Sequence, residues 1–234
     1  GIGKFQSQLD DFTEPLAETI KGFHNIRHRF GQWDAALARD AAGRRIHLAE
    51  EIGWIESRRA EMLSFWSKVE DGTIPTRVTH NDTKINNILF DKQGEVLCAI
   101  DLDTVMASTS LNDFGDAIRS YANTGDEDDR DLSRVGISLE MFSAYTDGYL
   151  SLRAAQLTDT EIGHLAFSAR YITFEQVLRF LMDYIDGDTY YKIKYPDHNL
   201  VRTHAQYRLL QSMEEHYGEM CRIVDGIAAK YRNA

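Results

Sequence analysis

Three aspartates and one asparagine with the chemistry of a cation site lie within one short stretch of the sequence. They are Asp82, Asn87, Asp101 and Asp103. Carboxylates that lie close together repel each other unless a cation, a proton or a lysine such as Lys84 offsets their charge. A hard divalent ion takes oxygen ligands, and Mg²⁺ suits a set made of Asn and Asp. The alternative is a turn-rich loop in which these side chains only accept hydrogen bonds from backbone amides.

A β-hairpin is predicted to bring these side chains to one place. Two short apolar runs, 88–90 and 96–100, flank a turn at 91–94 that contains a glycine, which is typical of a hairpin. With a loop at 92–95, Asp91 faces Val96 and Asn87 lies across from about Ile100. The residues before and after the hairpin therefore meet at one end of the same ribbon.

The spacing of the polar residues before the hairpin matches the catalytic loop of protein kinases. In that loop an H-x-D motif is followed by an asparagine five residues after the aspartate, as in His80, Asp82 and Asn87. After the hairpin the sequence reads Ile-Asp-Leu-Asp at 100–103, without the Phe-Gly of the usual kinase motif. This form resembles the aminoglycoside phosphotransferase and choline kinase superfamily, which phosphorylates small molecules.

Several blocks are similar to the bacterial N-acetylhexosamine 1-kinases of this superfamily. The likeness extends from about Phe5 to Gln211. It is most specific in the blocks at 79–87, 100–104, 113–117, 179–184, 186–188 and 194–202. The resemblance implies an ATP-dependent kinase that phosphorylates the anomeric (C1) hydroxyl of GlcNAc or GalNAc and that uses Mg²⁺.

The resemblance also implies roles for residues around the hairpin. Asp82 would be the catalytic base at the anomeric hydroxyl, and Lys84 would contact the transferred phosphate. Asn87 and Asp101 would hold Mg²⁺, with Asp103 as a reserve ligand. Phosphoryl transfer needs positioning and charge neutralisation more than covalent help, so these residue types suit the reaction.

The same resemblance assigns substrate binding to residues far from the hairpin. Arg179 and Tyr190 match positions that bind the sugar in the N-acetylhexosamine kinases. An arginine can donate several fixed hydrogen bonds to hydroxyl groups. The alternatives are an arginine in a surface salt bridge and a tyrosine at the edge of the core. His24 also lies in a similar block and could reach the sugar pocket.

Other polar residues are expected to have structural roles. His80 is expected to support the loop backbone, and Asp113 and Asp116 to cap the start of a helix. Phe114-Gly115-Asp116 looks like a DFG motif, but it lies too far downstream. The acidic run 126–131 is expected to form a solvated loop, because it lacks the glycine of a calcium-binding loop.

Helical periodicity dominates the rest of the chain. It predicts helices over 7–21, 33–70 with a break near Gly43, 112–123, 138–152, 158–186 and 199–231. In the first predicted helix, 7–21, the apolar face contains Leu9, Phe12, Leu16 and Ile20. In the second, 33–70, Ile46 is assigned to the buried face. Thr158 and Glu161 form a capping box. The predicted fold is α+β and predominantly α-helical, with a small β-hairpin at the catalytic site.

The resemblance implies a kinase-like fold of two lobes, of which this chain contains one. No G-x-G-x-x-G motif occurs, and the residues before Asp82 read as helices rather than as a sheet. We therefore expect residues 1–234 to be a single domain, the C-terminal lobe, without its N-terminal nucleotide-binding lobe. Since that lobe covers the nucleotide, the chain alone should bind ATP weakly and turn over little or not at all.

Composition limits the function classes further. The 234 residues are 43% hydrophobic and 27% charged, with a formal net charge of −11. This charge argues against a protein that mainly binds nucleic acid or an anionic membrane. No apolar run is long enough to span a bilayer, and the N-terminus lacks the apolar core of a signal peptide. With only two cysteines, a reducing, cytoplasmic location is expected.

Three functions other than a sugar 1-kinase are compatible with parts of the sequence or are suggested by related proteins. Another small-molecule kinase of the superfamily would act on choline, homoserine or an aminoglycoside. A non-catalytic pseudokinase scaffold is disfavoured because Asp82, Asn87 and Asp101 are all present. A sulfatase is excluded, because neither Cys98 nor Cys221 has a proline two residues later.

Overall fold

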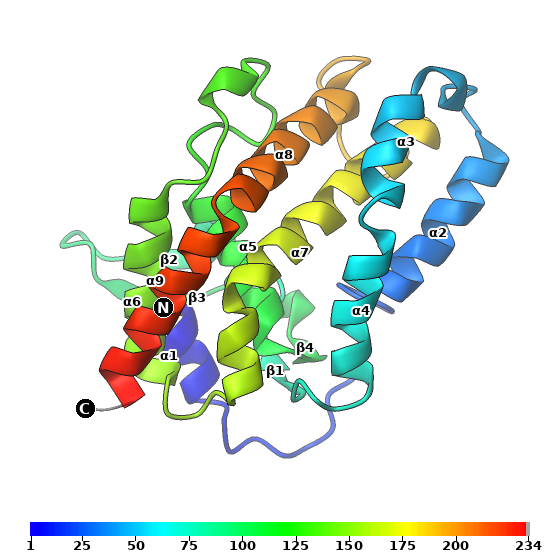
Figure 1. Ribbon diagram of the computed structural model, residues 1–234. Coiled ribbons are helices and arrows are strands. Elements are labelled where there is room, and N and C mark those ends of the chain that lie inside the picture. The colour runs from blue at the N-terminus through cyan, green and yellow to red at the C-terminus, as the bar shows by residue number, and fades with distance from the viewer. Residues whose placement is uncertain (233–234) are drawn as a thin grey trace.

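The computed structural model describes residues 1–232 and consists mainly of α-helices (Figure 1). The helices are α1 (Ile2–Ser7), α2 (Ile26–Arg39), α3 (Ala49–Glu56), α4 (Arg59–Glu70), α5 (Ser110–Tyr121), α6 (Leu139–Arg153), α7 (Asp159–Ile185), α8 (His198–Glu215) and α9 (Tyr217–Arg232). The short strands are β1 (Arg77–Thr79), β2 (Ile88–Phe90), β3 (Val96–Ala99) and β4 (Met106–Ser108). The predicted α+β fold with predominant helix is confirmed.

Helix α7 is the centre of the fold. It packs against α5, α8, α9 and α2, and most of its side chains are buried. A helix that is apolar on nearly all sides must lie inside the protein. The predicted capping box begins it, because Thr158 Oγ1 accepts from the Glu161 amide at 3.1 Å and the Glu161 carboxylate accepts from the Thr158 amide at 2.8 Å.

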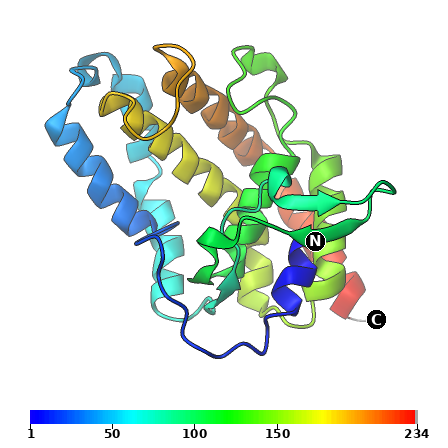
Figure 2. The same ribbon diagram turned by 180° about the vertical axis from the view of Figure 1, so that it is seen from behind.

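Two separate pairs of antiparallel strands lie beside the helices. β1 pairs with β4, and β2 pairs with β3 to form the predicted hairpin, which extends away from the helices in Figure 2. Ile100 donates to the Asn87 carbonyl at 2.9 Å, as the predicted register requires. Asp91 pairs with Glu95 rather than with Val96, because the register shifts between Leu89 and Phe90.

The helix predicted over 7–21 is wrong. α1 ends at Ser7, and turns and irregular backbone continue to Asn25. Pro15 cannot donate to a helical ladder and its ring clashes with the preceding turn. Phe12 and Ile20, two members of the apolar stripe, are 42% and 40% exposed.

The other helix predictions hold with changes at their ends. The predicted break near Gly43 is present between α2 and α3, and a second break separates α3 from α4. Ile46 lies in the first break and is 80% exposed, so its assignment to the core is wrong. The predicted helix 199–231 is interrupted at His216 between α8 and α9.

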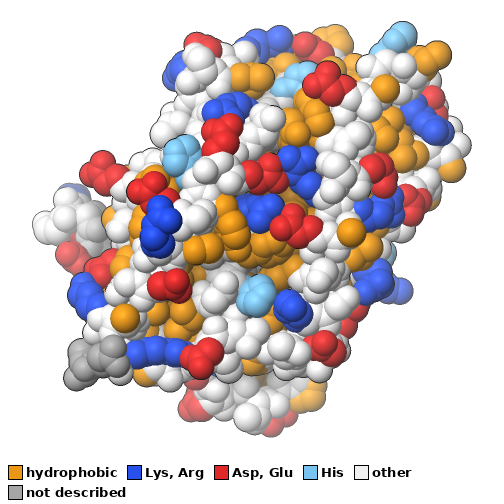
Figure 3. All heavy atoms as spheres, viewed as in Figure 1, with side chains coloured by type: hydrophobic (Ala, Val, Ile, Leu, Met, Phe, Trp, Pro, Cys, Tyr) orange, Lys and Arg blue, Asp and Glu red, His pale blue; other side chains and the backbone are white. Residues whose placement is uncertain are grey.

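The surface carries charges of both signs. On the face drawn in Figure 3, basic and acidic side chains are interspersed. Within residues 1–232, none of the helices has the length and apolar character needed to cross a membrane.

Candidate active site

Strands β1 and β4 place two loops side by side. The first loop (residues 80–87) follows β1, and the second loop (residues 100–105) precedes β4. Asn81 Nδ2 donates to the Thr104 carbonyl at 2.9 Å, and Thr104 Oγ1 donates to the His80 carbonyl at 2.7 Å. The pairing therefore brings the residues before and after the hairpin together, as the sequence predicts.

His80 supports both loops from a fully buried position. Its Nε2 lies 2.9 Å from the Ile100 carbonyl, and its Nδ1 accepts from the Asp82 amide at 3.3 Å. Since Nδ1 accepts, the ring proton must be on Nε2, which then donates to Ile100. The predicted structural role of His80 is confirmed.

Asp113 and Asp116 hold the first loop and do not cap the helix, so that prediction is wrong. The N-cap of α5 is Thr109, whose side chain accepts from the Leu111 amide. Asp113, which is fully buried, accepts from the amides of His80 and Asn81 at 3.0 and 2.7 Å. Burial raises the pKa of Asp113, although these hydrogen bonds favour its ionised form.

Asp116 anchors the same loop one helical turn later. Its Oδ2 accepts from the Thr83 amide at 2.7 Å, and its Oδ1 pairs with Arg119 at 3.0 Å. Between the two aspartates, a Cβ on Gly115 would lie 2.3 Å from the Ser168 carbonyl of α7. Gly115 therefore allows α5 to approach α7 closely, and α5 presents both carboxylates to the loop.

Asp82, Lys84 and Asn87 meet in the first loop. Lys84 Nζ lies 2.6 Å from Asp82 Oδ2, and Asn87 Nδ2 donates to the same oxygen and to the Asp82 carbonyl, both at 2.9 Å. The Asp82 side chain is 26% exposed and that of Lys84 is 42% exposed. The carboxylate is therefore oriented from two sides and remains open to solvent.

Asp101 lies close to this group through its backbone. The preceding residue, Ile100, donates to the Asn87 carbonyl, and Asp101 has a left-handed backbone with φ of 61°. Its exposed carboxylate makes no hydrogen bond or ion pair with any other part of the chain that the structure describes. Lys84, rather than a third carboxylate, lies against Asp82.

The donor set fits a magnesium ion. The Asn87 amide nitrogen donates to Asp82, which leaves its carbonyl oxygen available as a ligand, and among residues 1–232 the Asp101 carboxylate has no hydrogen-bond or ion-pair partner. Mg²⁺ is usually bound by one or two protein oxygens together with substrate phosphates and water. Within residues 1–232 no group of three or more His, Cys, Asp or Glu is arranged so that it could hold a metal ion.

Arg179 and Tyr190 line one pocket of about 210 Å³. Its lining residues are Arg29, Gln32, Arg179, Met182, Asp183, Asp186, Thr189, Tyr190 and Tyr191. The Arg179 guanidinium lies 5.6–5.9 Å from the ring centres of Tyr191, Phe23 and Tyr190. It forms no salt bridge within residues 1–232, which argues against the surface ion-pair interpretation. Tyr190 is 72% exposed, so it is not part of the core.

Asp183 shapes the rim of this pocket, and sequence reasoning gave it no role. The buried carboxylate accepts from the backbone amides of Thr189, Tyr190 and Tyr191 at 2.8–3.0 Å. Asn199 Nδ2 also donates to it at 2.8 Å. Asp183 thereby fixes the segment that carries Tyr190.

His24 does not line the pocket, contrary to the possibility raised from the sequence. It is buried between Glu175 on α7 and Asn81 in the first loop. Arg29, which does line the pocket, pairs with the other oxygen of Glu175 at 3.1 Å. Glu175 and Arg29 were also missed, since their partners are distant in sequence.

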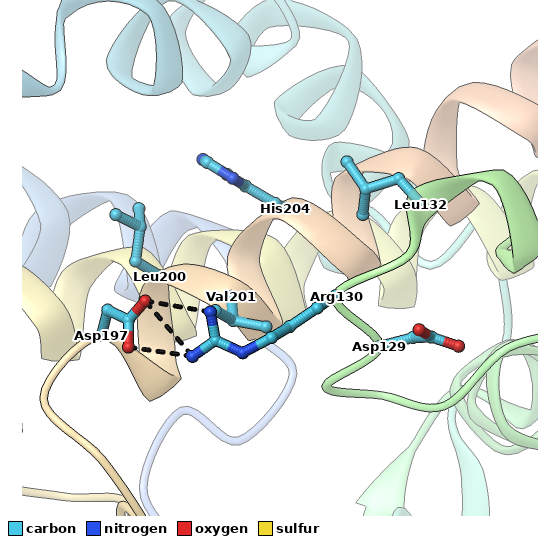
Figure 4. Close-up of a pocket in the computed structure, with 7 residues that line it drawn as sticks. All are labelled: Asp129, Arg130, Leu132, Asp197, Leu200, Val201 and His204. Carbon is cyan, nitrogen blue, oxygen red and sulfur yellow. Dashed lines mark hydrogen bonds and ion pairs between the residues drawn. The ribbon is translucent and has the colours of Figure 1, made fainter.

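A second pocket, of about 250 Å³, lies between the acidic segment and α8 (Figure 4). Arg130 pairs with Asp197 at 3.1 Å across it, and the Asp129 side chain extends away from that pair. The segment 126–131 is a loop, as predicted. None of the residues assigned to the site from the sequence lines this pocket.

Comparison with known families places the N-terminal two thirds of the chain in a phosphotransferase family. The sequence model described as APH, phosphotransferase enzyme family, matches residues 3–154. The matched region contains both loops, the hairpin and α5. It ends before α7 and α8, and therefore does not include Arg179 or Tyr190.

Proposed function

This chain belongs to the phosphotransferase enzyme family, and we propose that it is the catalytic and substrate-binding lobe of an ATP-dependent sugar kinase. The observation that carries the proposal is the first loop. It presents the Asp82 carboxylate between Lys84 and Asn87, and buried carboxylates of α5 hold its backbone.

Asp82 would act as the base. It would orient the acceptor hydroxyl and take its proton as the bond to phosphorus forms. Lys84, which pairs with Asp82 in this structure, would turn to the transferred phosphate. Asn87 and Asp101 would hold Mg²⁺, and the ion would neutralise charge on the phosphate oxygens.

The pocket supports a neutral polar acceptor. Asp183 is saturated by four N–H donors, and Asp186 pairs with Arg39 at 2.7 Å, so the carboxylates at the pocket are already engaged. The Arg179 guanidinium donates to Gln176 but forms no salt bridge within residues 1–232, and it would repel a cationic acceptor such as choline or an aminoglycoside. A sugar suits this site better, because its hydroxyls accept from Arg179 and its ring can lie against Tyr190.

We infer that the acceptor is an N-acetylhexosamine phosphorylated at C1. The support is that Arg179 and Tyr190, the two residues to which the resemblance to N-acetylhexosamine 1-kinases assigns sugar binding, line the same pocket.

The hairpin supports the presence of a second lobe. On the hairpin, Leu89, Phe90 and Leu97 are more than 40% exposed, and so is Leu102 in the adjacent second loop. A two-stranded hairpin with apolar residues on its surface is marginally stable by itself. We propose that an N-terminal nucleotide-binding lobe of the same protein packs here and covers ATP. The lobe described here should then have little or no kinase activity alone.

The test is phosphate transfer by the full-length protein. ATP and Mg²⁺ would be offered with GlcNAc, GalNAc, choline, homoserine or an aminoglycoside, and phosphorus NMR would identify the product linkage. A hexosamine 1-phosphate is the expected product. A 6-phosphate or a non-sugar product would refute the assigned acceptor but leave the phosphotransferase intact, whereas no transfer to any acceptor would refute both.

A further inference from the structure

A buried polar bridge connects the substrate pocket with the loop that carries Asp82. It consists of Arg29, Glu175, His24 and the Asn81 carbonyl, in that order. The distances along it are 3.1 Å from Arg29 Nε to Glu175 Oε1, 2.6 Å from Glu175 Oε2 to His24 Nδ1, and 2.8 Å from His24 Nε2 to the Asn81 oxygen.

The bridge fixes the protonation state of His24. A carbonyl oxygen can only accept, so Nε2 must donate to Asn81. Nδ1 faces a carboxylate that Arg29 also contacts and that is therefore held in its ionised form. Both ring nitrogens then carry a proton, and the ring is an imidazolium.

The electrostatics agree with this geometry. Burial by itself would lower the pKa of His24, but Glu175 and the Asn81 carbonyl outweigh it and the pKa is raised. Burial by itself would raise the pKa of Glu175, but His24 and Arg29 outweigh it and the pKa is lowered.

The backbone at both ends of the His24 contact is constrained. His24 and Asn81 have φ of 56° and 64°, in the left-handed region that residues other than glycine rarely occupy. Such conformations persist only when the surroundings hold them. Asn81 immediately precedes Asp82, so a change in its carbonyl position would turn the Asp82 side chain.

We propose that His24 is a positioning residue, which as an imidazolium clamps the Asn81 carbonyl and so fixes Asp82 relative to the pocket lined by Arg29 and Arg179. This inference rests on the proposed function. His24 touches neither the pocket nor the reacting groups, and its effect passes through the backbone of the first loop and through Glu175.

Kinetics on the full-length protein test the clamp. His24→Phe removes both hydrogen bonds, and His24→Gln keeps a donor for one of them. We expect kcat to fall about 10–100-fold in His24→Phe, because small displacements of reacting groups cost this much. His24→Gln should recover part of the rate. KM for ATP should change little, because none of the residues proposed to contact the phosphates or Mg²⁺ belongs to the bridge.

His204→Gln is the matched control. His204 pairs with a carboxylate, Glu51, at 2.9 Å and meets the Trp54 ring edge-on, but it makes no hydrogen bond or ion pair with either loop. Its variant should keep the wild-type kcat. If His24→Gln and His24→Phe, corrected for folded fraction, also keep it, the clamp is refuted.

A second readout needs no variant and no activity. ¹⁵N NMR of the imidazole groups in the full-length protein should show His24 protonated on both nitrogens near pH 6.5, where a histidine with an ordinary pKa is only about half protonated. A singly protonated ring would overturn the proposal even if the enzyme is a kinase. A doubly protonated ring in a protein that transfers phosphate to none of the acceptors would support the bridge and refute the proposed function instead.

Discussion

Replacement of Asp82 by asparagine should separate activity from stability. Asp82→Asn keeps the size of the side chain and an oxygen that can accept from Asn87 Nδ2. It removes the negative charge, and with it the proton acceptor and the partner of Lys84 at 2.6 Å.

The magnitudes of the two effects differ strongly. A positioned base contributes about 10²–10⁴ in rate, or about 3–5 kcal/mol of transition-state stabilisation. The ion pair with Lys84 is partly exposed, and such pairs contribute about 0.2–1 kcal/mol to stability. In a protein of this size that corresponds to a change in Tm of no more than about 2–4 °C.

The assay measures release of ADP and of phosphorylated acceptor by the full-length protein, together with thermal unfolding. Asp147→Asn is the matched control. Asp147 pairs with Lys230 at 2.7 Å, the same kind of exposed pair, but lies on α6 away from both loops. It should show the same small change in Tm and no loss of rate.

Two outcomes would refute the reasoning. If Asp82→Asn retains more than about a tenth of the wild-type rate, Asp82 is not the base. If it unfolds at a much lower temperature than Asp147→Asn, the carboxylate is a structural element of the loop.

Three further predictions concern packing, substrate binding and pH. Gly115→Ala should destabilise the protein by about 1–3 kcal/mol in urea titration, because the added Cβ would lie 2.3 Å from the Ser168 carbonyl; an unchanged midpoint would contradict the close packing. Arg179→Gln should raise KM for the sugar at least about tenfold and leave KM for ATP unchanged; an equal rise in both would remove Arg179 from the acceptor site. The His24–Glu175 pair should stabilise the fold most between pH 4.5 and 6.5. The raised pKa of His24 gives stability that is complete below pH 6.5 and is lost as pH rises through the pKa of the folded state. The lowered pKa of Glu175 gives stability that is complete above pH 4.5 and is lost as pH falls through the pKa of the folded state. The difference in Tm between wild type and His24→Gln, measured across pH, checks this, and a difference that grows at high pH would contradict it.

Local patterns in the sequence predicted local structure well. The capping box at Thr158, the hairpin after Asn87 and the support of the loop by His80 are confirmed, because each depends on neighbours close in sequence or on one fold-back. The helix predicted from the apolar stripe between Leu9 and Ile20 is wrong because that prediction also used only neighbours in sequence. Periodicity reports which residues could share a helical face, but not whether Pro15 lets that helix form.

Long-range polar contacts were beyond the reach of sequence patterns. Asp113 and Asp116 lie near the start of a helix, where capping residues are expected. Their carboxylates instead accept hydrogen bonds from backbone amides of a loop about thirty residues earlier in the chain. Strands β1 and β4 contain three residues each, too few for an alternating pattern, although their pairing places the second loop beside the first. The proposed roles of Asp82, Asn87 and Asp101 come from the family resemblance, whereas the positions of these residues depend on the distant partners.

One signal in the sequence could have revealed the organisation of the site. Glu175, Arg179 and Asp183 are four residues apart in a helix that is otherwise largely apolar, so they share one face of α7. Glu175 and Asp183 are buried and Arg179 is half-buried, and burial of charged side chains is costly unless each has a partner. Glu175 pairs with His24 in the bridge to the first loop, and Arg179 lies against aromatic rings such as that of Tyr191. Asp183 accepts from the backbone of the segment that carries Tyr190.

The spacing on α7 also suggests how the proposed acceptor pocket and the proposed base could be aligned. From Glu175 to Asp183 the helix rises about 12 Å, at 1.5 Å per residue. Along this distance one rigid, fully packed element holds the loop of the proposed base at one end and the rim of the acceptor pocket at the other. The alignment of acceptor and base would then depend on the α7 backbone more than on the flexible segments that it holds. A helix-breaking substitution between them, such as Val177→Gly, should therefore lower kcat more than it weakens acceptor binding, and parallel changes in kcat and KM would show that the two ends act independently.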